Sequence, residues 1–465
     1  MTSLLTPETV QTPFPVGGED GDRFDCRAVW YPLAYVEDLD KTKPTSFTLL
    51  GEDLVIWWEP GAQTWRVYGD YCPHRLAPLS QGRVNEAGQL ECPYHGWTFA
   101  GEGDCQSIPQ QYPDGQAQTA QRACARSLPT CEKQGLLFAY PGEAHHAEQT
   151  AVPIVDVLED DSPAWVCLNT FRDLPYDALT LLENVLDSSH IPYTHHNTVG
   201  KRSNVSPVDL EMVTEGRQGF TGVWAEGPRR GTLGTQHTTF IAPNLMWHDL
   251  TSQQFGRTLT VVYATPIRPG ECRLFARFPF RFPSQLPRLV IGLTPRWYSH
   301  LGQNRVLEDD QIFLHFQERY LANKGGSPAY QQACYLPTKA DLFVAKFRQW
   351  ITTYQVDPFP GQSLPPRLTT EQLMDRYHSH TQHCRSCRTG LRTIETLQTL
   401  SLAIALLCLS LLPLLTVSIA PNVGLGIGLS VITAIAWGTW AGLGKFKRSF
   451  YQGSPIPPRN LPAKG

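Results

Sequence analysis

The sequence predicts an α+β protein with two soluble domains, a linking segment and a pair of long apolar helices. Short β-type runs separated by glycine and proline fill residues 26–150, which predicts an antiparallel β-domain. Residues 165–350 mix strand-type and helical segments, as in an α/β-sheet domain with a helix-grip arrangement. Two uncharged apolar stretches occupy most of residues 397–443, which predicts a C-terminal two-helix transmembrane hairpin.

The composition excludes several classes of protein. Of the 465 residues 41% are hydrophobic and 18% are charged, which is typical of a folded chain long enough for two or three cores. A formal net charge of −4 without a lysine- and arginine-rich block predicts no nucleic-acid partner. Residues 1–25 form a polar leader that has neither the apolar core of a secretory signal nor the arginine content of a transit peptide.

Residues 26–150 predict a small antiparallel domain that presents loops. Residues 54–58 (LVIWW) and 65–68 (WRVY) are β-type runs, and the E-P-G segment between them predicts a turn. The chain has 12 cysteines, dilute over its length, and several stand beside histidines at the spacing of metal ligands. This usage indicates metal binding in a reducing compartment and not a disulfide framework.

Two cysteine–histidine motifs are the strongest local signal in the sequence. C-P-H at 72–74 and C-P-Y-H at 92–95 supply two thiolates, from Cys72 and Cys92, and two imidazoles, from His74 and His95. In a Rieske [2Fe–2S] cluster the thiolates bind one iron and the imidazoles bind the other. A structural Cys₂His₂ zinc site uses the same donors, and spacing alone does not separate the two kinds of site.

The flanks of these motifs resemble the Rieske domain of ring-hydroxylating oxygenases. The resemblance lies in H-R-L-A-P-L-S at 74–80 and C-P-Y-H-G-W at 92–97. It implies a [2Fe–2S] cluster held by Cys72, His74, Cys92 and His95. Rieske subunits of respiratory and photosynthetic cytochrome complexes typically have a further cysteine in each cluster loop and an N-terminal anchor, and neither loop here contains such a cysteine.

A second metal centre is predicted from N-V-L-D-S-S-H-I-P-Y-T-H at 184–195. Residues 179–189 are predicted to be helical, so Asp187 and His190, three positions apart, share a face. Pro192 is predicted to break the helix, so that the chain turns and brings His195 back. Two such histidines suit a 2-His-1-carboxylate iron site with positions open for O₂ and substrate. The competing interpretation is that Asp and His near a helix end are capping or surface residues.

The spacing N-x₂-D-x₂-H-x₄-H also resembles the motif of the oxygenase family. The resemblance implies that His190 and His195 bind a mononuclear Fe(II), with His196 ranked second. It further implies that Asp187 forms hydrogen bonds to a Rieske histidine of a neighbouring subunit and links the two centres in a homotrimer.

The third iron ligand is predicted in a later helix, around residues 308–321. E-D-D at 308–310 resembles the acidic segment that opens this helix in the family, which implies Asp310 as the ligand and Asp309 as the reserve. The alternative is that these acids only favour the positive end of a helix.

A Pro-rich link at 351–395 contains a C-x-x-C motif, Cys384 and Cys387. Neighbouring arginines favour the thiolate, so the pair is predicted to act as a dithiol–disulfide redox switch. Half of a metal site, completed by His378, His380 or His383, and two ordinary thiols near a membrane fit equally well.

The apolar stretches at 397–420 and 423–443 contain no charged residue. Each is long enough to cross about 30 Å of hydrocarbon at about 1.5 Å per residue, and the alternative is a buried helical hairpin of a soluble core. Basic residues flank the pair at 385–392 and 445–448, and the turn at 421–422 has no charge. The positive-inside rule therefore places the soluble body on the cytoplasmic side. Residues 444–465 are predicted to form a tail, of which the Pro-rich part at 454–465 has no core.

In combination these features resemble the pheophorbide a oxygenase-like Rieske proteins of plants and cyanobacteria. That group includes the lethal-leaf-spot type, a Rieske protein of the chloroplast translocon and protochlorophyllide-dependent oxygenases, and the resemblance covers nearly the whole chain after the leader. It implies a monooxygenase that inserts oxygen from O₂ into a chlorophyll-related tetrapyrrole with electrons from ferredoxin or a reductase. It also implies thioredoxin as a partner of the C-x-x-C motif.

Without a transit peptide, a cyanobacterial protein attached to the thylakoid or plasma membrane is predicted. Two other functions remain open at this point. One is a membrane redox sensor with a Rieske cluster but no oxygenase turnover. The other is an oxygenase of a sterol-like or other apolar ring.

Overall fold

The computed structural model describes residues 23–159, 165–252, 256–417 and 423–461. Most of the predicted leader and the turn at 421–422 lie outside the described residues. The chain divides into two compact units. The larger unit comprises Met1–Ile291 and Phe313–Arg367, and the smaller unit comprises Gly292–Ile312 and Leu368–Gly465.

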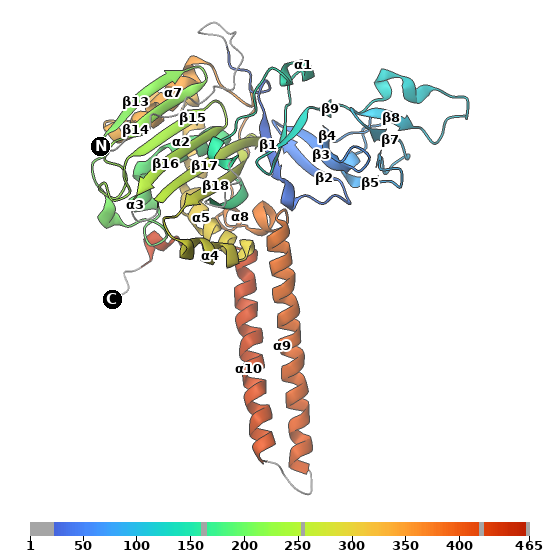
Figure 1. Cartoon of the computed structure of the whole chain (residues 1–465), viewed down its shortest axis with the longest axis vertical. Helices are drawn as coiled ribbons and strands as arrows, with labels where there is room; N and C mark the ends of the chain where they lie inside the picture. Colours follow the sequence, from blue (N-terminus) through green and yellow to red (C-terminus); the bar gives the residue numbers. More distant parts are fainter. Residues whose placement is uncertain (1–22, 160–164, 253–255, 418–422, 462–465) are drawn as a thin grey trace. The chain divides into compact units, whose positions relative to one another are not determined.

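The first part of the larger unit consists of three small antiparallel sheets (Figure 1). Their strand orders are β1-β11-β10, β2-β3-β4-β9 and β5-β6-β7-β8. The strands are β1 (Tyr31–Tyr35), β2 (Thr45–Leu49), β3 (Glu52–Glu59), β4 (Thr64–Gly69), β5 (Arg83–Val84), β6 (Leu90–Glu91), β7 (Thr98–Ala100), β8 (Asp104–Ser107), β9 (Ser127–Leu128), β10 (Thr130–Lys133) and β11 (Leu136–Ala139). The predicted hairpin is confirmed, because β3 and β4 pair antiparallel with Val55 opposite Tyr68.

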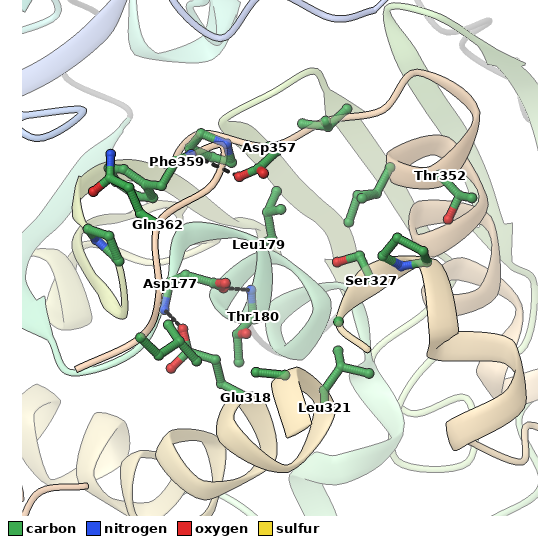
Figure 2. A pocket seen from close by; sticks show the side chains of 18 of the residues that line it. Asp177, Leu179, Thr180, Glu318, Leu321, Ser327, Thr352, Asp357, Phe359 and Gln362 are labelled. Atoms are coloured by element: carbon green, nitrogen blue, oxygen red, sulfur yellow. Dashed lines mark hydrogen bonds between the residues drawn. The ribbon is translucent and has the colours of Figure 1, made fainter. Parts of the chain in front are cut away.

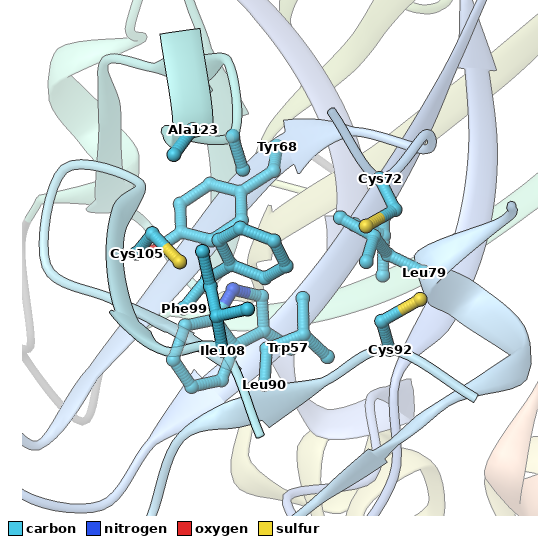
Figure 3. Packing of buried hydrophobic residues seen from close by; sticks show 12 residues of the cluster. Trp57, Tyr68, Cys72, Leu79, Leu90, Cys92, Phe99, Cys105, Ile108 and Ala123 are labelled. Carbon is cyan, nitrogen blue, oxygen red and sulfur yellow. The ribbon is translucent and has the colours of Figure 1, made fainter. Parts of the chain in front are cut away.

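A buried aromatic cluster lies beneath these sheets (Figure 3). Trp57 of β3 and Tyr68 of β4 meet edge to face, with ring centroids 5.6 Å apart. Phe99 of β7 joins them, and the thiols of Cys72 and Cys92 lie at the edge of the same cluster. Large aromatic side chains bury much apolar area from few positions, so strands this short still share a core.

The second part of the larger unit is a seven-stranded antiparallel sheet in the order β12-β18-β17-β16-β15-β14-β13. Its strands are β12 (Val166–Leu174), β13 (Leu210–Gly216), β14 (Gly219–Trp224), β15 (Gln236–Ile241), β16 (Leu245–Ser252), β17 (Gly256–Arg268) and β18 (Glu271–Arg281). Helices α2 (Ala178–Leu186) and α7 (Leu342–Thr353) accompany it, and Phe347 of α7 meets Phe240 of β15 edge to face at 5.1 Å. The predicted α+β architecture of a β-domain followed by a sheet with helices is confirmed.

The smaller unit contains the two long apolar helices, α9 (Arg385–Val417) and α10 (Val423–Lys447), which pack side by side as a hairpin (Figure 1). The Gln398 amide donates a hydrogen bond to the Trp440 carbonyl at 3.4 Å, and Gly444 leaves room for the same amide. By length and composition both helices are able to cross a membrane. Only 11% of the most apolar part of α9 and 6% of that of α10 are buried, unlike the core helix of a soluble protein.

Two predicted helix boundaries are wrong. The helix predicted for 179–189 ends at Leu186, because Asp187 adopts an extended backbone with ψ 95°. The helix predicted from residue 308 is α5 (Arg296–Asn323), which begins twelve residues earlier and runs through both units. The acids at 308–310 therefore stand in a helix interior, and the interpretation that they favour a helix N-terminus is excluded.

Candidate metal centres

The two cysteine–histidine loops have the same backbone design. The Cys72 N–H donates to the Ala77 carbonyl, and the Leu76 N–H donates back to the Cys72 carbonyl, at 2.8 and 2.9 Å. The second loop has the same two hydrogen bonds. The Cys92 N–H donates to the Trp97 carbonyl at 2.8 Å, and the Gly96 N–H donates to the Cys92 carbonyl at 3.1 Å. The fourth residue after each cysteine has a left-handed backbone, at φ 61° for Leu76 and 71° for Gly96. Both loops are therefore tight turns that follow the same backbone path.

Burial separates the two kinds of donor. The cysteines are 1% and 2% exposed, whereas His74 is exposed and His95 half-buried. The two imidazole rings lie 4.6 Å apart, and His74 also stacks on Trp97 with 5° between the planes. Within the residues that the structure describes, these four side chains are not among the groups whose ligand atoms converge within 4.8 Å. A pair of inner thiols and a pair of outer imidazoles fits a two-iron cluster better than one zinc ion.

The electrostatics of the two loops also fit a positively charged group. Burial raises the pKa of the Cys72 thiol to about 12, and the neighbouring Cys92 adds to the effect. A thiolate at this position therefore needs a nearby positive charge, which cluster iron supplies when it is bound.

The predicted second motif brings two histidines together. His190 Nε2 lies 3.2 Å from His195 Nε2, and the Nδ1–H of His190 donates to the Asp187 carbonyl. That bond fixes the tautomer and leaves Nε2 for a metal. His195 is only 5% exposed, as expected of an inward-facing ligand and not of a surface residue.

The chain reverses for a different reason from the one predicted. After α2 ends at Leu186, Asp187 starts a 3₁₀ turn, η6 (Ser188–His190), and then α3 (Ile191–Thr194) begins. Pro192 stands in the first turn of α3, where its missing N–H is not needed, so it does not break a helix. The break is at Asp187, whose Oδ1 accepts hydrogen bonds from the Ser189 N–H at 2.7 Å and hydroxyl at 2.6 Å.

The remaining candidates for this site differ in their surroundings. His196 Nδ1 accepts a hydrogen bond from the Arg202 N–H at 3.3 Å, which turns the ring toward that loop. Asp310 and Asp309 are 5% and 1% exposed in the interior of α5. Within the described residues, two groups of side chains could hold a single metal ion, and one of them consists of His190, His195 and Asp310.

Sequence reasoning missed His248 on β16. Its Nε2–H donates to the Val185 carbonyl at 2.8 Å, so Nδ1 is the acceptor for the Thr238 hydroxyl at 2.8 Å and the Gln236 amide at 3.1 Å. Burial lowers the pKa of His248 to about 4 and keeps the ring neutral. The ring thus braces the end of α2, from which the chain continues to His190. A histidine on a hydrophobic strand was the only signal, and no spacing connected it to the motif at 184–195.

The C-x-x-C motif lies in the smaller unit with two histidines, of which the sequence predicts only His380 as a possible ligand. His300 of α5 and His380 adjoin Cys384 and Cys387, and all four are buried. His378 instead pairs with Asp375 at 2.6 Å, and His383 contacts the Gln382 amide. Neither belongs to the cluster.

A separate cavity of about 620 Å³ lies in the larger unit (Figure 2). Its lining includes Asp177, whose N–H donates to Glu318 Oε1 at 2.9 Å and whose Oδ1 accepts from the Thr180 N–H at 2.6 Å. Burial and the Asp177 carboxylate raise the pKa of Glu318 to about 9, against the opposing effect of Arg319. Of the predicted site residues that the structure describes, none lines this cavity.

Comparisons with known proteins agree with the two centres. The family pattern described as Rieske [2Fe-2S] domain matches residues 29–130, and the pattern described as Pheophorbide a oxygenase matches residues 240–328. Pheophorbide a oxygenase, chloroplastic, of Oryza sativa subsp. japonica is 39% identical over 391 residues, which cover 78% of this chain and 73% of the relative. Flavonoid 8-hydroxylase 2, chloroplastic, of Ocimum basilicum is 35% identical over 395 residues, with the same coverage of 78% and 73%.

A solved structure shows the same fold. The crystal structure of dicamba monooxygenase bound to dicamba superposes with a TM-score of 0.56 over 71% of this chain and 97% of that chain. At 23% identity this likeness concerns the fold alone.

Proposed function

Because the chain belongs to the pheophorbide a oxygenase-like family of Rieske non-haem iron oxygenases, we propose that it inserts oxygen from O₂ into a chlorophyll-related tetrapyrrole. The class of enzyme and its two metal centres do not depend on the substrate. The protein is an oxidoreductase with a Rieske [2Fe–2S] cluster and a mononuclear iron site of histidine and aspartate. Rieske oxygenases take their electrons from a ferredoxin or a reductase.

We assign the cluster to Cys72, His74, Cys92 and His95, for which the matching loops and the burial of the two thiols are the support. The exposed ring of His74 suits an approach by an electron donor, because electrons reach a buried cluster most readily through an edge at the surface.

We assign the mononuclear iron to His190, His195 and Asp310. Two imidazoles with converging Nε2 atoms and one carboxylate are the donor set that leaves open positions on iron for O₂ and substrate. When iron is bound there, it supplies the activation of O₂. The chain's own contribution is to hold His190 in one tautomer through the Asp187 carbonyl and to brace this segment from His248.

Asp187 is proposed to connect neighbouring subunits of a homotrimer. Ser189 occupies Oδ1 of its carboxylate through two hydrogen bonds. These bonds fix the direction of the carboxylate group, as a bridge to a Rieske histidine of another subunit requires.

The substrate class rests on one observation, the 39% identity over 391 residues to a pheophorbide a oxygenase. The hairpin supports it. Its two helices are long and apolar enough to cross a bilayer, so they would hold the protein at a thylakoid or plasma membrane. Flat hydrophobic pheophorbide or chlorophyllide molecules partition into such membranes. The second candidate substrate is a flavonoid, because a flavonoid 8-hydroxylase is 35% identical over a similar span.

Labelled oxygen tests the proposal. The full chain in detergent is incubated with ¹⁸O₂, reduced ferredoxin, and either pheophorbide a, chlorophyllide a or a flavone. Incorporation of ¹⁸O into a chlorin supports the proposal, and incorporation only into the flavone or a sterol replaces its substrate class. His190→Ala should abolish turnover and leave the EPR signal of the reduced Rieske cluster intact. No incorporation into any substrate, with both iron centres loaded, would favour a redox sensor.

A further inference from the structure

Four buried side chains of the smaller unit, none of them a proposed iron ligand, converge on one point. His300 comes from α5 and His380 from the segment before α9, whereas Cys384 directly precedes α9 and Cys387 lies in its first turn. The first three are 0% exposed and Cys387 is 1% exposed. Their ligand atoms all lie within 4.8 Å of one another. These four residues are not ligands of either proposed iron centre, and the proposed function gives them no role.

The spacing of the four donors is that of a tetrahedron around one ion. Bonds of about 2.0–2.3 Å to zinc separate tetrahedral ligand atoms by about 3.3–3.8 Å. His300 Nδ1 lies 3.5 Å from Cys384 Sγ and 3.4 Å from Cys387 Sγ. His380 Nε2 lies 3.2 Å from Cys387 Sγ and 3.0 Å from His300 Nδ1. These four distances are therefore equal to or slightly shorter than those between the ligands of a tetrahedral zinc ion.

Local structure presents these donors from a rigid frame. His380 belongs to a π-helix, η10 (Tyr377–Thr381), in which the Gln382 N–H donates to the Tyr377 carbonyl at 2.9 Å. The wider π-turn rotates the histidine relative to an α-helix, and such turns are frequent at functional sites. Cys384 directly precedes α9 and its carbonyl accepts a hydrogen bond from the Arg388 N–H at 3.0 Å, so Cys384 and Cys387, three residues apart, share one face.

The helix that contributes His300 is fixed against the same motif. The Trp297 N–H donates to the Ser386 hydroxyl at 3.1 Å, between the two cysteines. Gly390 leaves the space that the Trp297 ring fills, since an added Cβ would lie 2.7 Å from that ring. These contacts hold the first turn of α5 and the first turns of α9 at a fixed distance.

We propose that His300, His380, Cys384 and Cys387 bind one structural zinc ion. Two thiolates and two imidazoles in a tetrahedron are the donor set of zinc, and four protein ligands without solvent access form a closed, non-catalytic site. The ion joins α5 to the base of the hairpin. Ten residues after His300 the same helix contains Asp310, so the zinc site also fixes the register of the segment that includes the proposed iron ligand.

This assignment competes with the predicted redox switch at the same cysteines. A dithiol switch reacts through a thiolate that a partner protein reaches, and reactive cysteines are at least partly exposed. Both sulfurs here are buried between two imidazoles. The surroundings therefore favour metal ligation.

Metal analysis tests the site in the full chain, purified anaerobically in detergent after expression with zinc. We expect one zinc per chain in addition to iron. Cys387→Ser and His300→Ala should lose this zinc and keep the EPR signal of the Rieske cluster. Cys408→Ser, a buried thiol on α9 outside the cluster, is the matched control and should keep the zinc. His190→Ala should also keep it, which excludes zinc that has entered the mononuclear iron site.

X-ray absorption at the zinc edge does not depend on whether a variant folds. The unmodified protein should show two sulfur ligands at about 2.3 Å and two nitrogen ligands at about 2.0–2.1 Å. A shell of nitrogen and oxygen only would overturn the proposal, as would zinc retained in Cys387→Ser. A Cys384–Cys387 disulfide found by mass spectrometry in zinc-free protein would overturn it in favour of the switch.

Discussion

A single imidazole, His248, organises the segment that leads to the proposed iron ligands. His248→Ala would leave the Val185 carbonyl and the Thr238 hydroxyl without their buried partner, at a cost of about 1–3 kcal/mol. We expect less mononuclear iron per chain and at least a tenfold lower turnover, while the Rieske EPR signal is unchanged. Iron analysis and single-turnover assays measure this. The exposed His237→Ala is the control, and normal iron content in His248→Ala would contradict the bracing role.

Glu318 gives the larger unit a pH dependence. Its folded-state pKa, about 9, exceeds the ordinary value of 4.5, so the folded protein holds a proton that the unfolded chain releases. Its contribution to stability is therefore fully present below pH 4.5 and is lost as the pH rises through about 9. We expect the thermal midpoint of the unmodified protein to fall across this window and that of Glu318→Gln to fall less. Thermal melts between pH 5 and 10 test this, with the exposed Glu132→Gln as control. Equal slopes for Glu318→Gln and the unmodified protein would count against it.

The sequence predicts those site residues whose partners are close in the chain. Cys72 and His74 share one short loop, and so do Cys92 and His95, so their spacing alone reports that they belong together. His300 and His248 have no such signal. His300 meets His380 only because α5 and the π-helix pack together, 80 residues apart in sequence. A local pattern contains no information about a contact of that range.

At the scale of elements, the strands were more predictable than the helix ends. Apolar runs bounded by glycine and proline located β3 and β4. The early start of α5 was missed because its signal is short: a threonine and a proline, Thr294 and Pro295, directly precede Arg296, and this pair is typical of a helix N-terminus. The end of α2 was missed because Asp187 has no breaker beside it and stops the helix by capping the next turn instead.

A buried ion pair connects two elements of the smaller unit. Arg376 donates to both carboxylate oxygens of Glu308 at 2.6 and 2.7 Å, and to the Ser449 carbonyl at 2.8 Å. Arg376→Met would leave the Glu308 carboxylate buried and uncompensated, so we expect a loss of about 3–5 kcal/mol. The double variant Glu308→Gln with Arg376→Met should recover part of it. Denaturant titration measures both.

A surface pair serves as the control for that experiment. Lys447 lies 3.8 Å from Glu395, and both side chains are about a third or more exposed. Pairs of this kind contribute about 0–1 kcal/mol, so Lys447→Met should change the free energy of unfolding little. Similar losses for Arg376→Met and Lys447→Met would show that burial does not set the strength of the Glu308–Arg376 pair.

At the scale of the whole molecule, α9 leads away from the base of the hairpin and α10 leads back to it, both within the smaller unit. The returning segment is bound where the outgoing one begins. The Arg376 N–H donates to the Tyr451 carbonyl at 2.9 Å, the Thr381 hydroxyl donates to the Phe450 carbonyl at 2.7 Å, and Phe450 is fully buried. The base of the hairpin is thus part of the core of the smaller unit. The most apolar parts of α9 and α10 contribute almost nothing to that core, because they are nearly all exposed.

This arrangement predicts that the hairpin can be shortened but not cut off. Replacing residues 400–439 with a short glycine–serine linker keeps Gln398 beside Trp440, so both metal centres and cooperative unfolding should survive. A chain that stops at residue 399 loses Phe450 and Tyr451 and should unfold more easily. In vesicle flotation the full chain should float, and the shortened one should stay in solution because its lipid-facing surface is gone. A full chain that fails to float would mean that the helices pair with each other without entering a bilayer.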